Sequence, residues 1–359
     1  MIKSEISEIK KVLKSEDYAI SEVWSTYVNM SKEVIFSSKN YYSNMSKEVR
    51  EVYSSIFVKS LSGKQERNLL TLDFPIEEEQ EGGKQLKLYN RLKDQTGDGI
   101  EDLINEIIEN YNPKSNFAIL IAKANYDVPK KTSDDLELGD SEEVYNFMVT
   151  AICPMDLDKP SLCYDRDEND FVENPRNWTI QMPEIGFLFP TFSNRQSNVH
   201  ECMYYVKKAN EVHLELMEGV LGCQLSLNAY EQKEKFNEIV ESNLDDLSIG
   251  DLVELNKNIN IFTEEMRRDG ENTKLKNMQI ENLLTSISNK EIDIEEDIEI
   301  MADNIAEKNY NILTAGTILI RTNHEGIELI KQRSIDGRDY LVIPMDEVEL
   351  NGIKLKSKK

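Results

Sequence analysis

The hydrophobic pattern changes its period along the chain, and this change constrains the fold more than any other feature of the sequence. Two apolar runs, residues 117–124 and 144–152, are rich in β-branched and aromatic side chains and have the length of buried strands. From residue 210 to residue 310 the apolar side chains recur instead at helical spacing. The chain therefore combines a β-rich middle with a later helical segment.

Shorter patterns predict the elements on either side of the β-rich middle. Before it we expect helices at residues 2–13, 47–61, 86–92 and 100–108, and strands at residues 20–28, 33–37 and 69–74. Near the C-terminus we expect strands at residues 317–322, 340–343 and 348–353. Before the second of these strands, Asp336-Gly337 has the composition of a tight hairpin turn.

Two further segments of the middle carry specific expectations. Residues 130–141 are polar and acidic, which predicts a mobile loop between the two apolar runs. Residues 178–182 and 184–189 are extended and are punctuated by Pro183 and Pro190. Because proline cannot donate to a sheet ladder, these two segments are predicted to be edge strands.

Together the patterns predict an α+β fold with more than one folding unit. A length of 359 residues corresponds to two or three domains at roughly 150 residues each. We expect a mixed unit at residues 1–208 that contains the β-rich part, a helical unit at residues 209–310 and a small β unit at residues 311–359.

The charge of the chain disfavours one class of function. Its 42 basic and 67 acidic residues give a net charge of −25, which opposes general binding to nucleic acid phosphates or to anionic lipid surfaces. No apolar run approaches the roughly 20 residues that span a bilayer, and the first residues lack the apolar region of a signal peptide. The four cysteines form no CxxC pair. We therefore expect a cytoplasmic protein without disulfides, in which the cysteines are buried thiols.

Several short sequence motifs, taken in order, resemble those of one family. They are Glu5-Ile6-Ser7-Glu8-Ile9-Lys10, Leu61-Ser62-Gly63, Asn68-Leu69-Leu70, Glu81-Gly82-Gly83, Tyr126-Asp127-Val128-Pro129, Ala151-Ile152-Cys153-Pro154, Pro183-Glu184-Ile185-Gly186-Phe187-Leu188-Phe189-Pro190, Leu221-Gly222-Cys223, Glu231-Gln232-Lys233-Glu234 and Ile335-Asp336-Gly337-Arg338. In these motifs the chain resembles the domain of unknown function 4317 family, found mainly in Firmicutes. The resemblance implies a bacterial, cytosolic protein, and it implies no activity, cofactor or catalytic residue.

Two segments combine rigid prolines with polar and aromatic side chains, a mixture typical of a ligand or partner surface. They are residues 126–129 and 183–198. The candidate binding residues in and beside these segments are Asp127, Glu184, Asn194, Arg195 and His200. An ordinary sheet edge with a structured loop would produce the same pattern.

Motifs for metal binding and catalysis are weaker. His200, Cys202 and His213 have the chemistry of zinc ligands, but their spacing matches no zinc motif. Ser62-Gly63-Lys64 lacks the spacing of a phosphate loop, and a helix end accounts for it better. Because no nucleophile lies in a catalytic motif either, we expect no cofactor and no structural metal.

Three functions remain open. The favoured one is a non-enzymatic protein-binding or regulatory factor whose partner is another protein, because no catalytic signature is present. The alternative is an enzyme on a small or nucleotide-like substrate that uses Asp127, Glu184, Arg195 and His200. The third is an acidic mimic of nucleic acid that binds a basic partner.

Overall fold

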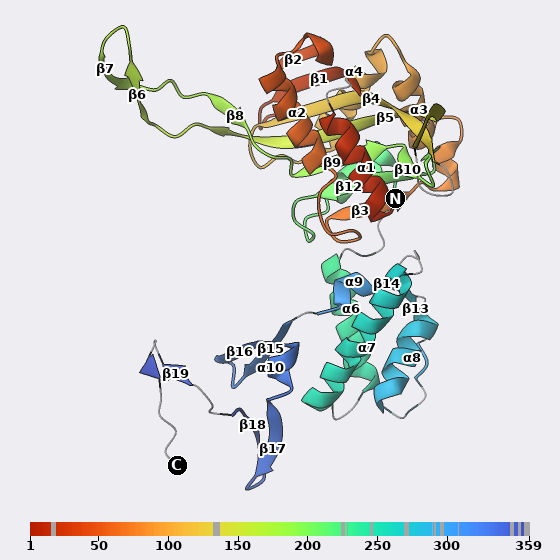
Figure 1. Cartoon of the computed structure of the whole chain (residues 1–359), viewed down its shortest axis with the longest axis vertical. Helices are drawn as coiled ribbons and strands as arrows, with labels where there is room; N and C mark the ends of the chain where they lie inside the picture. The colour runs from red at the N-terminus through yellow and green to blue at the C-terminus, as the bar shows by residue number, and fades with distance from the viewer. Residues whose placement is uncertain are drawn as a thin grey trace. The chain divides into compact units, whose positions relative to one another are not determined.

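The chain forms two compact units, Met1–Ala229 and Tyr230–Lys359, drawn in Figure 1. The computed structural model describes residues 1–15, 19–131, 137–223, 227, 229–244, 247–268, 273–288, 290, 292–294, 298–307, 309–344, 348–350 and 353–354. The first unit has two hydrophobic cores and the second unit has one of its own.

The first unit is built on one large antiparallel sheet. Its strands are β1 (Ile20–Val28), β2 (Val34–Tyr41), β3 (Leu69–Asp73), β4 (Phe117–Lys131), β5 (Glu137–Leu157), β8 (Trp178–Ile180), β9 (Ile185–Phe189) and β12 (Glu201–Val206). They lie in the order β2-β1-β4-β5-β9-β12-β3, and β8 pairs with β5 outside this path. Since helices and antiparallel strands are both abundant and follow no βαβ order, the predicted α+β class is confirmed.

Helices cover both faces of the sheet, so its central strands are buried on both sides. One face packs against α1 (Lys3–Lys14) and α2 (Lys47–Lys59), and the other against α3 (Lys84–Lys93) and α4 (Asp98–Asn110). The alternation of side chains along β4 explains the two cores. Ala118, Leu120 and Ala122 belong to the core under α1 and α2, whereas Ile119 and Ile121 belong to the core under α4.

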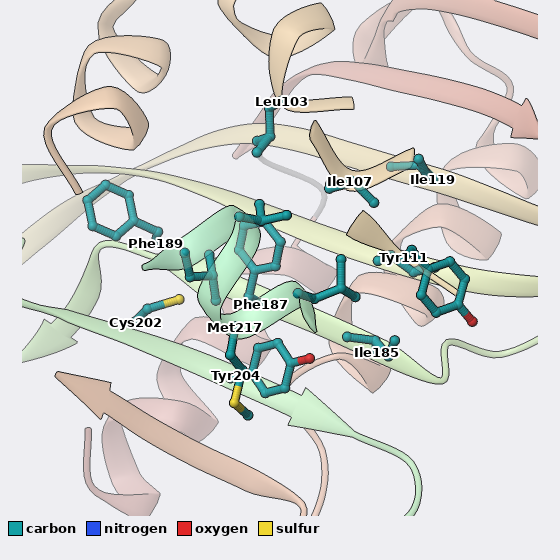
Figure 2. Packing of buried hydrophobic residues seen from close by; sticks show 14 of the residues in the cluster. Leu103, Ile107, Tyr111, Ile119, Ile185, Phe187, Phe189, Cys202, Tyr204 and Met217 are labelled. Atoms are coloured by element: carbon teal, nitrogen blue, oxygen red, sulfur yellow. The ribbon is translucent and has the colours of Figure 1, made fainter. Parts of the chain in front are cut away.

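The core beneath α4 also contains a short helical segment, which the sequence placed in the next domain. Figure 2 shows Leu103 and Ile107 of α4, Phe187 of β9 and Met217 converging there. Met217 begins a single π-helical turn, η3 (Met217–Leu221), which follows α5 (Leu214–Leu216). Because these turns bury their apolar face in the first core, the first compact unit extends to Ala229, beyond the boundary we expected at residue 208.

Two expectations for the middle of the chain are wrong. Strand β9 is not an edge strand, because it pairs with β5 on one side and with β12 on the other, and all of its residues are buried. Pro183 and Pro190 lie just outside its ends, so neither removes a hydrogen bond from the ladder. The predicted loop at residues 130–141 is shorter, since β4 continues to Lys131 and β5 begins at Glu137; residues 132–136 lie outside the described part.

The second unit begins with helices packed around one core. They are α6 (Ala229–Asn243), α7 (Ile249–Arg268), α8 (Asn277–Ser288) and α9 (Ala302–Ile305), joined by the small ladder of β13 (Lys274–Lys276) with β14 (Glu299–Met301). Phe236, Leu255 and Leu284 are among the residues of this core. None of the helices in the described part combines the length and apolar character that crossing a membrane requires.

Small hairpins follow the helices. They are β15 (Asn309–Thr314) with β16 (Ile318–Asn323), β17 (Lys331–Ile335) with β18 (Arg338–Val342), and β19 (Glu349–Leu350) with β20 (Ile353–Lys354); α10 (His324–Ile327) follows β16. Asp336 and Gly337 join β17 to β18 with φ of 52° and 74°. Two consecutive positive φ angles are what a tight hairpin turn needs, so the turn predicted there is confirmed. A separate β unit at residues 311–359 stays a proposal.

Strand β2 forms one edge of the large sheet. Among the described strands it pairs only with β1. Its apolar side chains Val34, Ile35 and Phe36 are each about half exposed, at 49%, 56% and 56%. One side of β2 therefore keeps a row of backbone groups that no described strand pairs.

Candidate functional site

Asn194 and Arg195 form the turn of a short hairpin, β10 (Thr191–Ser193) with β11 (Gln196–Asn198). Both residues have positive φ, 51° and 60°, which asparagine tolerates better than arginine. The backbone N–H of Asn194 donates to Oε1 of Glu5 at 2.7 Å. Because Glu5 is buried in the first turn of α1, this bond fastens the hairpin to that helix.

The two terminal nitrogens of the Arg195 guanidinium bind groups of the chain itself. Nη1 lies 3.2 Å from Oε1 of Glu8, and Nη2 donates to the carbonyl oxygen of Pro129 at 2.8 Å. The same Glu8 oxygen accepts a hydrogen bond of 2.7 Å from the hydroxyl of Tyr126. Arg195 thus connects the hairpin turn to α1 and β4 through Nη1 and Nη2, whereas its Nε is buried without a hydrogen-bond partner among the described residues.

We expect Arg195→Ala to lower the free energy of unfolding by about 1–2 kcal/mol, because it removes charge-assisted hydrogen bonds at a side chain that is only 24% exposed. Asp127→Ala, at an exposed position, serves as the control and should stay within about 0.5 kcal/mol of the parent. Urea denaturation at pH 7 measures both. If Arg195→Ala were as stable as the parent, the guanidinium would be free for a ligand, as the sequence hypothesis requires.

The other three predicted residues lie apart from this turn. Asp127 is exposed on β4. Glu184 lies at the far end of β9 from the hairpin, with Oε1 3.9 Å from Nζ of Lys207. His200 is exposed and pairs through Nδ1 with Oε1 of Glu79 at 2.7 Å. The structure therefore brings together Asn194 and Arg195 and does not assemble the group that the enzyme hypothesis used.

The cysteines have the properties of core residues, with one exception. Burial raises the pKa of the Cys153 and Cys223 thiols to about 12, and burial also raises the pKa of Cys202. Thiols with raised pKa values are poor nucleophiles at neutral pH. Cys163 is only half-buried, so the prediction that it is a buried thiol is wrong: it lies on β6 (Leu162–Asp165), whose residues are all half-buried or exposed.

The histidines and Cys202 do not assemble a metal site in the described part of the chain. Cys202 faces the core beneath α4, while Nδ1 of His213 lies 3.1 Å from Oε1 of Glu215. Among the residues that the structure describes, no three histidine, cysteine, aspartate or glutamate side chains converge as metal ligands would.

A projecting hairpin is the feature that the sequence patterns missed. Between β5 and β8 the chain forms β6 and β7 (Asp170–Glu173), and Figure 1 shows these strands at the end of a long extension away from the body of the first unit. We call residues 158–180 the arm. The rings of Trp178 in the arm and Tyr27 of β1 lie 6.4 Å apart, which marks its base.

Large apolar side chains are exposed along the arm. Leu162 is 72% exposed, Phe171 69% and Tyr164 54%, and the rings of Tyr164 and Phe171 lie 6.1 Å apart, edge to face. A signal for these strands was present, because Leu162 and Tyr164 alternate with Cys163 and Asp165. The strands are only four residues long, too short for periodicity to distinguish from a loop.

Comparisons with known proteins identify a family but no individual relative. A search of curated proteins found no match, and a search of solved structures found none. The model of the domain of unknown function family DUF4317 matches residues 1–353. Because this match extends over nearly the whole chain, the protein belongs to the DUF4317 family, as its short sequence motifs predicted.

Proposed function

We propose that the protein is a non-enzymatic binding factor that docks onto another protein through the arm. The observation that carries the proposal is the exposure of Leu162, Tyr164 and Phe171 on one projecting hairpin. Soluble proteins rarely gather exposed large apolar side chains without a partner for them. Aromatic and leucine side chains on a protruding element are also suited to fill a pocket on a partner.

The arm is held in shape by its own hydrogen bonds. Asn174 N–H donates to the carbonyl of Ser161 at 2.9 Å, Arg176 Nε to the carbonyl of Asp158 at 2.7 Å, and Thr179 Oγ1 to Oδ1 of Asp158 at 2.6 Å. A preformed hairpin loses less conformational entropy on binding than a flexible loop does. This supports a docking element with a fixed shape.

The charge around the apolar tip indicates the chemistry of the partner. The arm has three basic residues, Lys159, Arg166 and Arg176, and they are outnumbered by the acidic residues at and next to it, Asp156, Asp158, Asp165, Asp167, Glu168, Asp170 and Glu173. The whole chain carries a net charge of −25, so a second copy would be repelled. The partner we propose is therefore a different protein with an apolar pocket and a basic rim, met in the bacterial cytoplasm, where free thiols persist.

A site-specific photocrosslinker tests this proposal. It is placed at Leu162 of the arm or, as the matched control, at Ile76, which is 74% exposed in η2 (Ile76–Glu79) of the same unit. We expect one basic protein to crosslink from position 162 and not from position 76. The double variant Leu162→Ser/Phe171→Ser should abolish co-purification of that protein, with unfolding free energy within about 0.5 kcal/mol of the parent.

Three results would contradict the proposal. One is equal crosslinking from the two positions, and another is co-purification that survives the double variant. The third is a crosslink from position 162 to a second copy of the chain, which would make the arm a dimerisation element instead.

A further inference from the structure

A pocket of about 640 Å³ lies at the end of the large sheet, on the face that α3 and α4 cover. Its lining includes Lys123 and Asn125 of β4, Asn146 of β5, Tyr89 of α3 and Pro190. We call it the sheet-end pocket. Its volume falls within the range of about 300–1,000 Å³ that is usual for small-molecule sites.

Lys123 is the unusual residue of this pocket. It is 9% exposed, its Nζ donates to the main-chain carbonyl of Asp94, and Nζ lies 5.6 Å from the centre of the Trp24 ring. Burial lowers the pKa of its ammonium group. A buried cation needs a counter-charge to offset its lost hydration.

The nearby carboxylates are already engaged with other groups. Glu22 pairs with Lys39 at 2.9 Å. The Asp94 carboxylate accepts hydrogen bonds from the backbone N–H groups of Thr96, Gly97 and Gly99. These two carboxylates attract the Lys123 ammonium at a distance, and Lys39 repels it. Within the described residues, no carboxylate lies at ion-pairing distance from Lys123.

We propose that the sheet-end pocket binds a small monocarboxylate with an apolar body, whose carboxylate pairs with Lys123. Asn125 and Asn146 face each other across β4 and β5, and their side-chain N–H groups supply donors for the second carboxylate oxygen. The apolar body lies along Tyr41, Tyr89, Leu92, Val144 and Pro190, which line the same pocket. This site is independent of the arm.

The other charges of the pocket select against polyanions. Glu22, Asp94 and Glu143 line it together with Lys93 and Lys123. Nζ of Lys93 lies 4.0 Å from the centre of the Tyr89 ring. A nucleotide or a phosphorylated molecule would place several negative charges against these three carboxylates, which disfavours it by repulsion. A single carboxylate matches the one buried cation.

The test uses 4-fluorophenylacetate as the probe, followed by fluorine NMR in titrations with the full chain. The neutral 4-fluorophenylacetamide and the doubly charged 4-fluorophenyl phosphate are the comparison probes. We expect saturable binding of the carboxylate and weaker binding of both comparison probes. Lys123→Met, which keeps the length of the side chain, should weaken carboxylate binding about tenfold or more and leave amide binding unchanged.

Two further variants complete the test. Lys207→Met removes a lysine that is 54% exposed and lies outside the pocket, and it should bind the carboxylate as the parent does. Asn146→Asp keeps Lys123 but adds a carboxylate at an exposed pocket position, and it should also weaken binding about tenfold. Absence of saturable binding to the parent overturns the proposal, and so does equal binding by the parent and Asn146→Asp.

Discussion

Gly186→Val is expected to lower the unfolding free energy of the first unit by about 3 kcal/mol or more, although valine is a better strand former than glycine. A Cβ at position 186 would lie 2.6 Å from Cβ and Oγ of Ser60 and 2.8 Å from the carbonyl oxygen of Thr150. Ser60 is fully buried at the end of α2. Glycine therefore lets the backbone of β9 contact the end of that helix, and any side chain must force the two elements apart.

The matched experiment makes the same glycine-to-alanine change at two sites. Gly186→Ala should cost about 1–3 kcal/mol. Gly250→Ala, in the first turn of α7, meets only Oγ of Ser248 at 3.4 Å and should leave stability unchanged or slightly raised. Urea denaturation followed by circular dichroism measures both. Equal stability of the two alanine variants would show that α2 and β9 can separate without cost.

Arg91→Met is expected to lower the unfolding free energy by about 3 kcal/mol at pH 7. The Arg91 side chain, 9% exposed, donates from Nη1 and Nη2 to the two carboxylate oxygens of Glu106 at 2.9 and 2.7 Å. Methionine leaves the carboxylate partly buried without its partner. The double variant Arg91→Met/Glu106→Met should recover most of the loss, because it removes both charges.

The pH dependence of this pair has a definite sign. Burial raises the pKa of Glu106, but the hydrogen bonds and positive charge of Arg91, together with the charges of Lys84 and Lys87, outweigh burial and lower it overall. A lowered folded-state pKa stabilises the protein above the unfolded value of about 4.3, and the stabilisation is lost as the pH falls through the folded-state pKa. The difference between parent and Arg91→Met should therefore shrink below about pH 4.3.

A surface ion pair provides the control for Arg91→Met. Lys114→Met breaks the pair with Glu211, in which the lysine is 72% exposed, and it should cause no measurable change in stability. If Lys114→Met cost as much as Arg91→Met, burial would not be the cause of the Arg91 effect.

The elements with strong local patterns could be predicted from the sequence. Strand β1 has the bounds that its pattern predicted, residues 20–28, and α1 and α2 begin within one residue of the predicted positions. In α1, the buried residues Ile6, Ile9 and Leu13 recur at helical spacing. Such spacing depends on residues close together in the chain, so no knowledge of distant contacts is needed.

Features that depend on distant partners could not be predicted in this way. The prolines beside β9 resemble those of an edge strand, and only pairing with β5 and β12 shows that it is central. The apolar face of residues 214–221 indicates a buried helix without indicating which core buries it. Arg195 looked available for a ligand because Glu8, its partner, is 187 residues away in sequence.

The candidate sites were predicted less well than the fold for the same reason. Residues 183–198 were chosen for their composition, and two of them, Pro190 and Ser197, line the sheet-end pocket. Lys123 itself lies in an apolar run, where a single lysine gives no sign of whether its amine reaches solvent, a carboxylate or a pocket. Only the arrangement of β4 against the loop after α3 places it there.

The open edge at β2 has a consequence for handling the protein. Its half-exposed Val34, Ile35 and Phe36, with the backbone groups that no described strand pairs, form a template onto which another copy's β2 can add. In neutral solution the net charge of −25 opposes such pairing. Acidification protonates the carboxylates and concentrated salt screens them, so both treatments remove the barrier that keeps one molecule's sheet from continuing into the next.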